Sequence, residues 1–490
     1  SLAVKFFEKF SRRKLLKQAA ILVPSTLFVS QALGNTQISL NNILTKSGFK
    51  NKITATLYDL ETNKIIDSYN EELQLPLASV AKAVTAVYGM EAIGQNYTFG
   101  TELFTDGLIK KDILEGNIYL VGGADPSLTT DDLNLFVKAL KSRGIRSISG
   151  DFFYDDFALP QFLSIDPSQL PEESFNPGFS GLNLNNNKVL FSWRKDSGTH
   201  KLSLEARGPN SKAFVDSITI VGRAQARVVF EYILEKTERI ERWYVSRKVL
   251  GKSGVRWLPV RLSSTYTCTA LKYLLLQNGI KVGAPKRRKK PKNNLTLLYR
   301  HKSIKLRELS KKMLDRSTNV TAEIIGLYAA NFWELDTPII STSGKIMTKW
   351  FNFVTGSVDS KFDNHSGLSV NSRVSSSAFV RFLSRPETRE ILPSILKTRK
   401  IYGSAKQRIK SANIEIIAKT GTMHFNRGLA GYITKNGIPC AVFAIFSADL
   451  DKKMLIKDHQ LSNPPGSKIW LSQAKSIENT VLSTWAQGYI

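Results

Sequence analysis

The chain has 490 residues, enough for about two or three domains, and its hydrophobic content of 42% and aromatic content of 10% are those of a globular protein. Its formal net charge of +28 favours anionic partners, but no base-reading motif accompanies the charge, so we expect no nucleic-acid partner. Because the sequence has no C-x-x-C pair and no clustered histidines, we also expect no metal and no other cofactor.

Residues 1–34 have the features of an export signal of the twin-arginine type. Arg12 and Arg13 lie in a basic stretch, and a short apolar region follows over residues 19–32. This region is shorter than a typical membrane-spanning helix, and Ser30-Gln31-Ala32 is a candidate cleavage site. We therefore expect export to the periplasm or bacterial cell envelope. An uncleaved N-terminal anchor helix is the alternative.

The first motif whose residues could carry out catalysis is Ser79-Val80-Ala81-Lys82. It follows Pro76 and begins an apolar run that continues to Val87, a pattern typical of the start of a buried helix. At positions i and i+3, the hydroxyl and the amine lie on one helix face, where the amine can activate the hydroxyl as a nucleophile. Ser-x-x-Lys recurs at five other places in this lysine-rich chain, so the motif alone is more typical of a helix cap.

Residues 99–299 form a long stretch in which most of the predicted elements are strands. The stretch begins with strand patterns, and alternating polar and apolar residues predict further strands over 218–229 and 239–246. A helix is predicted over 265–277, where Gly279 ends it. We expect about two small β-rich domains here.

Residues 286–292 form the densest basic block, with six lysines and arginines in seven positions. Such a block can hold a protein to an anionic cell-envelope surface, either phospholipid or cell-wall carboxylates. A solvated surface loop without a binding role is the alternative.

The second motif, Ser317-Thr318-Asn319, lies between two segments with helical periodicity, 306–314 and 322–328. It therefore falls at a helix–helix junction, where a hydroxyl and an amide can face a cleft. Taken alone, the motif is better explained as a capping Ser/Asn pair.

The third motif, Lys419-Thr420-Gly421-Thr422, contains the one Lys-Thr-Gly in the chain and follows an apolar strand pattern over 414–418. Two more strand patterns, 429–433 and 440–446, come after it with short connections, which predicts an antiparallel sheet. Gly421 has no side chain, so another backbone can approach the strand closely.

The two cysteines lie far apart in the sequence. Cys268 falls in the predicted helix of residues 265–277 and Cys440 in a predicted core strand. We expect two buried thiols that do not pair.

The three motifs occur in the order that is typical of penicillin-interacting serine enzymes. Two further strings, Tyr-Leu-Val-Gly-Gly-Ala-Asp-Pro-Ser-Leu at 119–128 and Leu-Asn-Leu-Asn-Asn-Asn at 182–187, extend the similarity. On these residues the chain resembles the D-alanyl-D-alanine carboxypeptidase/endopeptidase family, the class C low-molecular-mass penicillin-binding proteins. The 238 positions between Ser79 and Ser317 match the long insert of that family. Asn364 and His365 depart from it, since they stand where the family has Asp and Gly before Ser-Gly-Leu-Ser.

The resemblance implies an α+β fold with a serine β-lactamase/transpeptidase-like catalytic domain, in which helices flank an antiparallel sheet. Two separated segments, 35–98 and 300–490, would form this domain, and residues 99–299 would be a large inserted β-rich module.

The resemblance also implies roles for five catalytic residues. Ser79 would attack the substrate carbonyl with Lys82 as its base, and Ser317 would pass the proton to the leaving amine under the influence of Lys419. Asn319 would hold an amide of the substrate.

The substrate-binding residues would be Thr420, Gly421 and Thr422 on the third motif. The two threonine hydroxyls would bind the terminal carboxylate of the substrate, and the backbone N–H groups of Ser79 and Thr422 would form the oxyanion hole.

The expected function is a serine D,D-carboxypeptidase or D,D-endopeptidase that cleaves D-Ala-D-Ala or D,D cross-links in peptidoglycan. The expected partners are peptidoglycan stem peptides and β-lactam antibiotics, since penicillins would acylate the same serine. Two other functions stay open: a β-lactamase or esterase that uses this serine, and a non-catalytic scaffold that binds the cell wall.

Replacing Arg12 and Arg13 with lysine tests the export signal. Because the twin-arginine pathway reads the arginine pair, we expect precursor to accumulate in the cytoplasm, measured by fractionation and immunoblotting. Normal processing of the double variant would show that the protein uses another route.

Overall fold

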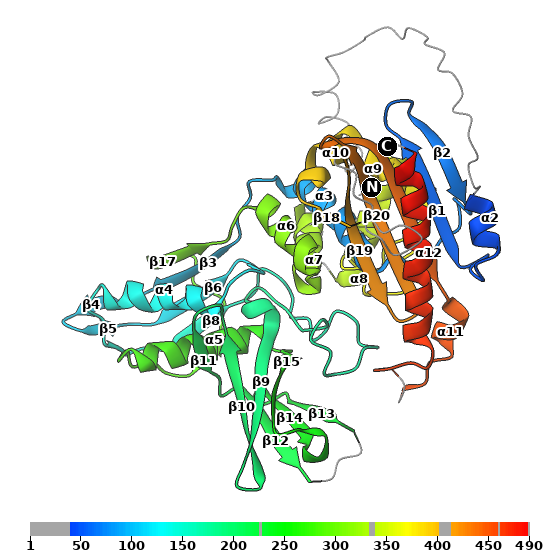
Figure 1. Cartoon of the computed structure of the whole chain (residues 1–490). Helices are drawn as coiled ribbons and strands as arrows, with labels where there is room; N and C mark the ends of the chain where they lie inside the picture. The colour runs from blue at the N-terminus through cyan, green and yellow to red at the C-terminus, as the bar shows by residue number, and fades with distance from the viewer. Residues whose placement is uncertain (1–39, 225–227, 333–338, 401–412, 459–460, 489–490) are drawn as a thin grey trace, which may run out of the picture.

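The computed structural model describes residues 40–224, 228–332, 339–400, 413–458 and 461–488 (Figure 1). The predicted export signal, residues 1–34, lies outside the described residues. None of the described helices combines the length and apolarity that a membrane span requires.

A six-stranded antiparallel sheet holds the third motif, with the strand order β18-β19-β20-β21-β1-β2. The strands are β1 (Ile53–Asp59), β2 (Lys64–Tyr69), β18 (Lys397–Arg399), β19 (Ile414–Met423), β20 (Asn426–Lys435) and β21 (Ile438–Ala448). The three successive strands predicted from the sequence are therefore confirmed as β19, β20 and β21. The first strand, β1, pairs with the last, β21, so the two ends of the chain share one sheet.

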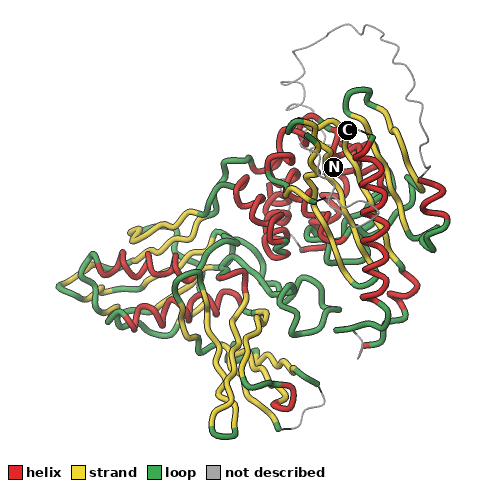
Figure 2. Tube along the Cα trace, viewed as in Figure 1, coloured by secondary structure: helices red, strands yellow, loops and turns green. Residues whose placement is uncertain are grey.

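Helices cover both faces of this sheet (Figures 1 and 2). One face packs on a large apolar core and the other on a smaller core that includes Trp470 and Trp485. The helices of the first face are α3 (Ala81–Ile93), α6 (Leu306–Arg316), α7 (Asn319–Phe332), α8 (Ile340–Thr355), α9 (Ser376–Ser384) and α10 (Pro386–Ile391). Those of the second face include α2 (Leu40–Thr45) and α12 (Ser467–Gln487), and the short α11 (Leu450–Met454) follows β21.

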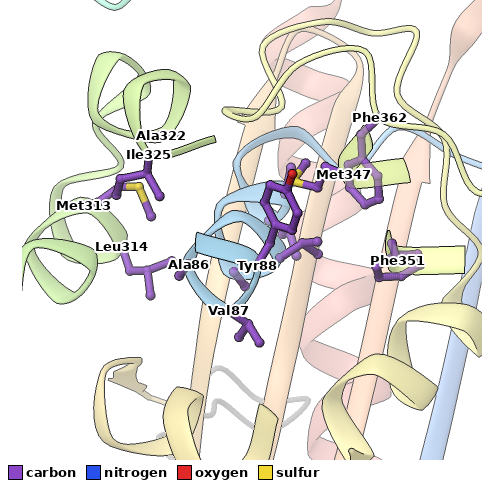
Figure 3. Packing of buried hydrophobic residues seen from close by; sticks show 14 of the residues in the cluster. Ala86, Val87, Tyr88, Met313, Leu314, Ala322, Ile325, Met347, Phe351 and Phe362 are labelled. Atoms are coloured by element: carbon purple, nitrogen blue, oxygen red, sulfur yellow. The ribbon is translucent and has the colours of Figure 1, made fainter. Parts of the chain in front are cut away.

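Helix α3 is the centre of the larger core, and nearly all of its residues are buried. Side chains of α6, α7 and α8 enclose it, as Figure 3 shows for Met313 and Ile325 on one side of the helix and Met347 beside Tyr88 on the other. A helix that is apolar on every side is typical of a fully buried element. This packing fixes the N-terminal end of α3, where the first motif lies.

The remaining sheets lie together on one side of the molecule (Figure 2). A five-stranded sheet has the order β16-β8-β6-β3-β17, and smaller sheets have the orders β4-β5-β7, β11-β10-β9-β15 and β12-β14-β13. Their strands are β3 (Gly100–Thr105), β4 (Leu108–Lys110), β5 (Ile113–Glu115), β6 (Ile118–Gly122), β7 (Ser147–Ile148), β8 (Phe152–Asp155), β9 (Lys188–Asp196), β10 (Thr199–Arg207), β11 (Lys212–Phe214), β12 (Ile218–Arg223), β13 (Phe230–Glu235), β14 (Ile240–Ser246), β15 (Ser253–Pro259), β16 (Pro285–Arg287) and β17 (Thr296–Lys302). Helices α4 (Thr130–Lys141) and α5 (Ser263–Gln277) pack against each other in the same core.

The predicted helix of residues 265–277 is confirmed as α5, and the predicted strand of residues 239–246 is confirmed as β14. The strand predicted over 218–229 was too long, because β12 ends at Arg223 and a separate strand, β13, begins at Phe230. Strand β17 pairs with β3 and runs across the expected boundary between residues 299 and 300. The division into domains stays a prediction.

The two cysteines differ in burial. Cys268 is fully buried in α5, as expected. Cys440 is only half-buried in β21, where its thiol donates to the carbonyl of Ile433 at 3.3 Å, so the prediction of a buried thiol was wrong for it. Both are free cysteines.

The basic block of residues 286–292 is docked on β8 rather than free on all sides. Lys286 pairs with Asp151 at 2.8 Å, and Arg287 pairs at the same distance with the buried Asp156. The guanidinium of Arg288 lies 4.9 Å from the ring centre of Phe153. Part of the basic block therefore stabilises the packing against β8. Contact of the block with an anionic surface stays a prediction.

A glycine at the crossing of α3 and α7 generates a prediction about stability. A Cβ on Gly89 would overlap Cγ2 of Ile325, a stiff β-branched side chain. Gly89→Ala should lower the free energy of unfolding by roughly 1–3 kcal/mol through overpacking, measured by urea denaturation. The double variant with Ile325→Ala should lose less than the sum of the two single losses. Gly283 faces open space, so Gly283→Ala is the matched control, expected within about 0.5 kcal/mol of the parent. An equal effect of the two glycine substitutions would contradict the crossing as the cause.

Candidate active site

The structure brings Ser79 and Lys82 into direct contact. Ser79 lies in a 3₁₀ turn, Ala78–Val80, and α3 begins just after it at Ala81, two positions later than a helix starting at the serine. Lys82 occupies the first turn of α3, and its Nζ donates to Ser79 Oγ at 2.8 Å.

The turn that carries Ser79 packs closely against the backbones of two glycines. Ala78 has a φ of 48°, an uncommon value for a residue with a side chain. A Cβ on Gly367 would overlap the Ala78 carbonyl, and one on Gly421 would lie 2.7 Å from the Ser79 nitrogen. A glycine is therefore required on both sides of the serine, and Gly421 places β19 directly against its backbone.

Lys82 is fully buried, with no exposed surface. Its Nζ also donates to the Ser366 carbonyl at 2.8 Å. Burial lowers the pKa of Lys82 well below its ordinary value, and the positive charge of Lys419 lowers it further, whereas Glu323 opposes the shift. The amine is therefore suited to exist in its neutral, proton-accepting form.

Ser317 and Lys419 form the second contact pair. Ser317 ends α6 in a left-handed conformation with a φ of 56°, and its hydroxyl accepts from Lys419 Nζ at 3.2 Å. The amine also donates to the Thr420 carbonyl at 2.7 Å. Burial, followed by the charges of Arg399 and Arg427, lowers the pKa of Lys419 to about 7.

Asn319 begins α7, which confirms the helix–helix junction predicted for the second motif. Its side-chain amide donates to the carbonyl of Phe175 at 2.9 Å. Phe175 belongs to the segment between β8 and β9, so this segment reaches the motifs of the other half of the chain. Nothing in the sequence around Phe175 indicated this contact.

Strand β19 presents an open edge beside the motifs. On its outer side β18 pairs only with Ile416, Ile417 and Ala418, so among the described residues the stretch 419–423 has no strand partner there. An extended peptide can add to such an edge through main-chain hydrogen bonds. Thr420, Gly421 and Thr422 all lie on this stretch.

Two arginines flank the third motif and were not among the predicted site residues. Arg427 donates to the Thr422 hydroxyl at 2.9 Å and forms a two-point ion pair with the buried Glu478 of α12, at 2.8 and 2.7 Å. Arg399 approaches the Thr420 hydroxyl at 3.5 Å. The hairpin places Arg427 opposite Thr422, so counting the register from the turn could have found it.

The described residues include no group of three or more His, Cys, Asp or Glu side chains that could hold a metal.

The architecture and these contacts define a class of protein, the serine β-lactamase/transpeptidase-like fold with a serine–lysine pair at the start of its central helix. The sequence profile of the D-Ala-D-Ala carboxypeptidase 3 (S13) family matches residues 36–460. The chain belongs to this family, which confirms the resemblance seen in its motifs.

Individual relatives align over shorter stretches. The chain is 27% identical over 169 residues to a D-alanyl-D-alanine carboxypeptidase of Actinomadura sp. (strain R39), which is 34% of this chain and 30% of the relative. It is 34% identical over 97 residues to the D-alanyl-D-alanine carboxypeptidase DacB of Haemophilus influenzae, 20% of each chain. These alignments thus span less than a third of either curated relative.

Solved structures confirm the predicted α+β fold. Penicillin-binding protein 4 (dacB) of Haemophilus influenzae superimposes with a TM-score of 0.69 at 20% identity, over 92% of this chain and all of that chain. The same protein in complex with a β-lactam gives a TM-score of 0.62 at 22% identity, over 85% and 95% of the two chains.

The low pKa of Lys419 predicts a pH dependence. Because this pKa is about 7, the ammonium is present at lower pH and is lost as the pH rises through that value. We expect the rate of acylation by a fluorescent penicillin to fall on the alkaline side. Arg399→Gln removes the largest charge effect, so it should raise the Lys419 pKa and move this fall to higher pH.

Arg300→Gln is the matched control, because Arg300 pairs with Glu102 on the surface of β17 and β3. Its profile should follow the parent. If Arg399→Gln left the pH profile unchanged, the assignment of the alkaline fall in rate to Lys419 would be contradicted.

Proposed function

We propose that this protein is a serine D,D-carboxypeptidase/endopeptidase that cleaves D-Ala-D-Ala bonds or D,D cross-links of peptidoglycan through an acyl-serine intermediate. The observation that carries the proposal is the 2.8 Å contact between the buried Lys82 amine and the Ser79 hydroxyl. Membership of the D-Ala-D-Ala carboxypeptidase 3 (S13) family supports the choice of substrate.

Acylation begins when neutral Lys82 takes the proton of Ser79 Oγ and the oxygen attacks the substrate carbonyl. The oxyanion then lies against the backbone N–H groups of Ser79 and Thr422. The close approach of Gly421 to the Ser79 nitrogen supports this arrangement, since Thr422 is the next residue along β19.

The leaving D-amino acid needs a proton on its nitrogen. Ser317 is the donor in this proposal, because its hydroxyl is in contact with Lys419 at 3.2 Å. The Lys82 ammonium then returns its proton to Ser317 and becomes neutral again, and the positive charge of Lys419 favours the transfer. Water then hydrolyses the ester of Ser79 and releases the shortened peptide.

Substrate binding uses the open edge of β19. The peptide adds as a strand beside residues 419–423, where the hydroxyls of Thr420 and Thr422 receive its terminal carboxylate. The positive charges of Lys419, Arg399 and Arg427 favour a carboxylate at this position. Asn319 must exchange its contact with Phe175 for the substrate amide.

β-Lactams would acylate the same serine. The β-lactam complex of the Haemophilus influenzae protein supports this part of the proposal, because that protein has the same fold. We further propose export by the twin-arginine route to the periplasm, where peptidoglycan lies. There the basic block of residues 286–292 would contact an anionic surface.

The chain offers an internal control for the identity of the nucleophile, because Ser394 also begins a Ser-x-x-Lys that follows a proline. Ser79→Ala should abolish covalent penicillin labelling, whereas Ser394→Ala should label normally in a gel assay. Lys82→Ala should slow labelling by about 10²–10⁴, since it removes the base. A folded Ser79→Ala protein that still takes up the label would show that another serine is the nucleophile.

Mass spectrometry of purified muropeptides, before and after incubation, tests the reaction. Loss of terminal D-Ala indicates carboxypeptidase activity, and conversion of cross-linked dimers to monomers indicates endopeptidase activity. Rapid turnover of penicillin with unchanged muropeptides would identify a β-lactamase instead. Binding without any of these reactions would favour a scaffold.

A further inference from the structure

Glu323 is a buried carboxylate that the mechanism above does not use. It lies on α7, one helical turn after Asn319, and its side chain has no exposed surface. A buried carboxylate is costly unless hydrogen bonds or a nearby positive charge compensate for its lost hydration.

The compensating hydrogen bonds come from backbone N–H groups in the loop of residues 365–366. The backbone N–H of Ser366 donates to Glu323 at 2.8 Å, and that of His365 donates to both carboxylate oxygens, at 3.1 and 3.2 Å. Burial raises the pKa of Glu323, and these hydrogen bonds and the charge of Lys82 oppose the rise, because they favour the ionised carboxylate. The Glu323 side chain therefore fastens the backbone of residues 365–366 to α7.

The same loop residue contacts the candidate base. The Ser366 carbonyl accepts from Lys82 Nζ at 2.8 Å, and this amine makes its other contact with Ser79 Oγ. Ser366 thus connects Glu323 through its N–H with Lys82 through its carbonyl. A shift of this residue would change the direction in which the Lys82 amine points.

The His365 side chain also holds the loop, against α7 and α8, and adds no charge. Its ring lies above Gly326, where any Cβ would overlap it, and its Nε2 is 2.6 Å from Ser343 Oγ. Burial lowers the pKa of His365 to about 3, so the ring is neutral near pH 7. The charged groups facing the Lys82 amine are then Lys419 from β19 and Glu323 from α7.

We propose that Glu323 is a positioning residue for acylation. Its carboxylate holds the peptide groups of His365 and Ser366 so that the Ser366 carbonyl directs the Lys82 amine at Ser79 Oγ. Its negative charge stabilises the Lys82 ammonium that forms when the serine proton is transferred. The proton passes from Ser79 Oγ to Lys82 Nζ and reaches the leaving amine by way of Ser317, while Glu323 takes no part in the transfer. This inference rests on the proposed function, because it requires Lys82 to be the base.

The test compares Glu323→Gln and Glu323→Asp with Ser343→Ala, through the rate of penicillin acylation against pH and the melting temperature. Glu323→Gln removes the charge that opposes the lowering of the Lys82 pKa, so this pKa should fall further. The acid limb of the rate profile should move to lower pH, and the maximal rate should fall about tenfold, because the ammonium formed during acylation loses a stabilising charge.

Glu323→Asp keeps the charge but shortens the side chain, so its acid limb should stay in place while its maximal rate falls. This variant also carries the test if the glutamine variant does not fold. Ser343→Ala loosens the same loop by removing the contact with the His365 ring. It should lower the melting temperature yet acylate within about twofold of the parent at every pH, since a lost hydrogen bond of about 1 kcal/mol there leaves the Glu323 contacts intact.

Parental rates and an unmoved acid limb in both Glu323 variants would overturn the proposal. A fall in Ser343→Ala as large as that in Glu323→Gln would overturn it too, because general loosening of the loop would then explain both. If the parent protein itself takes up no penicillin at Ser79, the proposed function fails, and this result is distinct from either outcome.

Discussion

The burial of the Lys82 amine is the constraint on which the rest of the site depends. An amine without water must be neutral or must have partners, and Lys82 has two partners, one on its own helix turn and one on the 365–366 loop. The apolar side chains around α3 exclude water from it. The helices that enclose α3 therefore serve the chemistry as well as the stability of the fold, because looser packing would hydrate the amine and return it to its charged form.

Two lysines of the site have lowered pKa values for partly different reasons. Burial is the larger cause for both. For Lys82 the next cause is the single charge of Lys419, opposed by Glu323, whereas for Lys419 it is the charges of Arg399, Arg427 and Lys397, opposed by Asp315. One lysine is thereby suited to accept a proton, and the other can change its charge close to neutral pH. A single site can then both withdraw a proton from the nucleophile and favour its delivery to the leaving group.

The sequence was most informative for the catalytic motifs and for segments with a clear strand or helix periodicity. The order of the three motifs predicted the contacts of Ser79 with Lys82 and the family, and periodicity predicted β19, β20, β21 and α5. Phe175 and Glu323 were missed because their contacts join segments that no local pattern relates, 144 and 42 positions apart in sequence. The strand predicted over 218–229 was too long because alternation continues in the sequence beyond Arg223, where the hydrogen-bonded ladder ends.

The pairing of β1 with β21 has a consequence for biosynthesis. Ile53 lies opposite Ser447, so the sheet that supports the nucleophile cannot be completed until the chain has been synthesised beyond Ser447. Closing so long a loop costs conformational entropy before the contacts repay it, and folds with such distant contacts form slowly. The segment that carries Ser79 is made early and must wait for its partner strands, while the sheets between β3 and β17 can form in the meantime. A chain shortened at its C-terminal end would thus lose the partner of its first strand, and with it the support of a motif made hundreds of residues earlier.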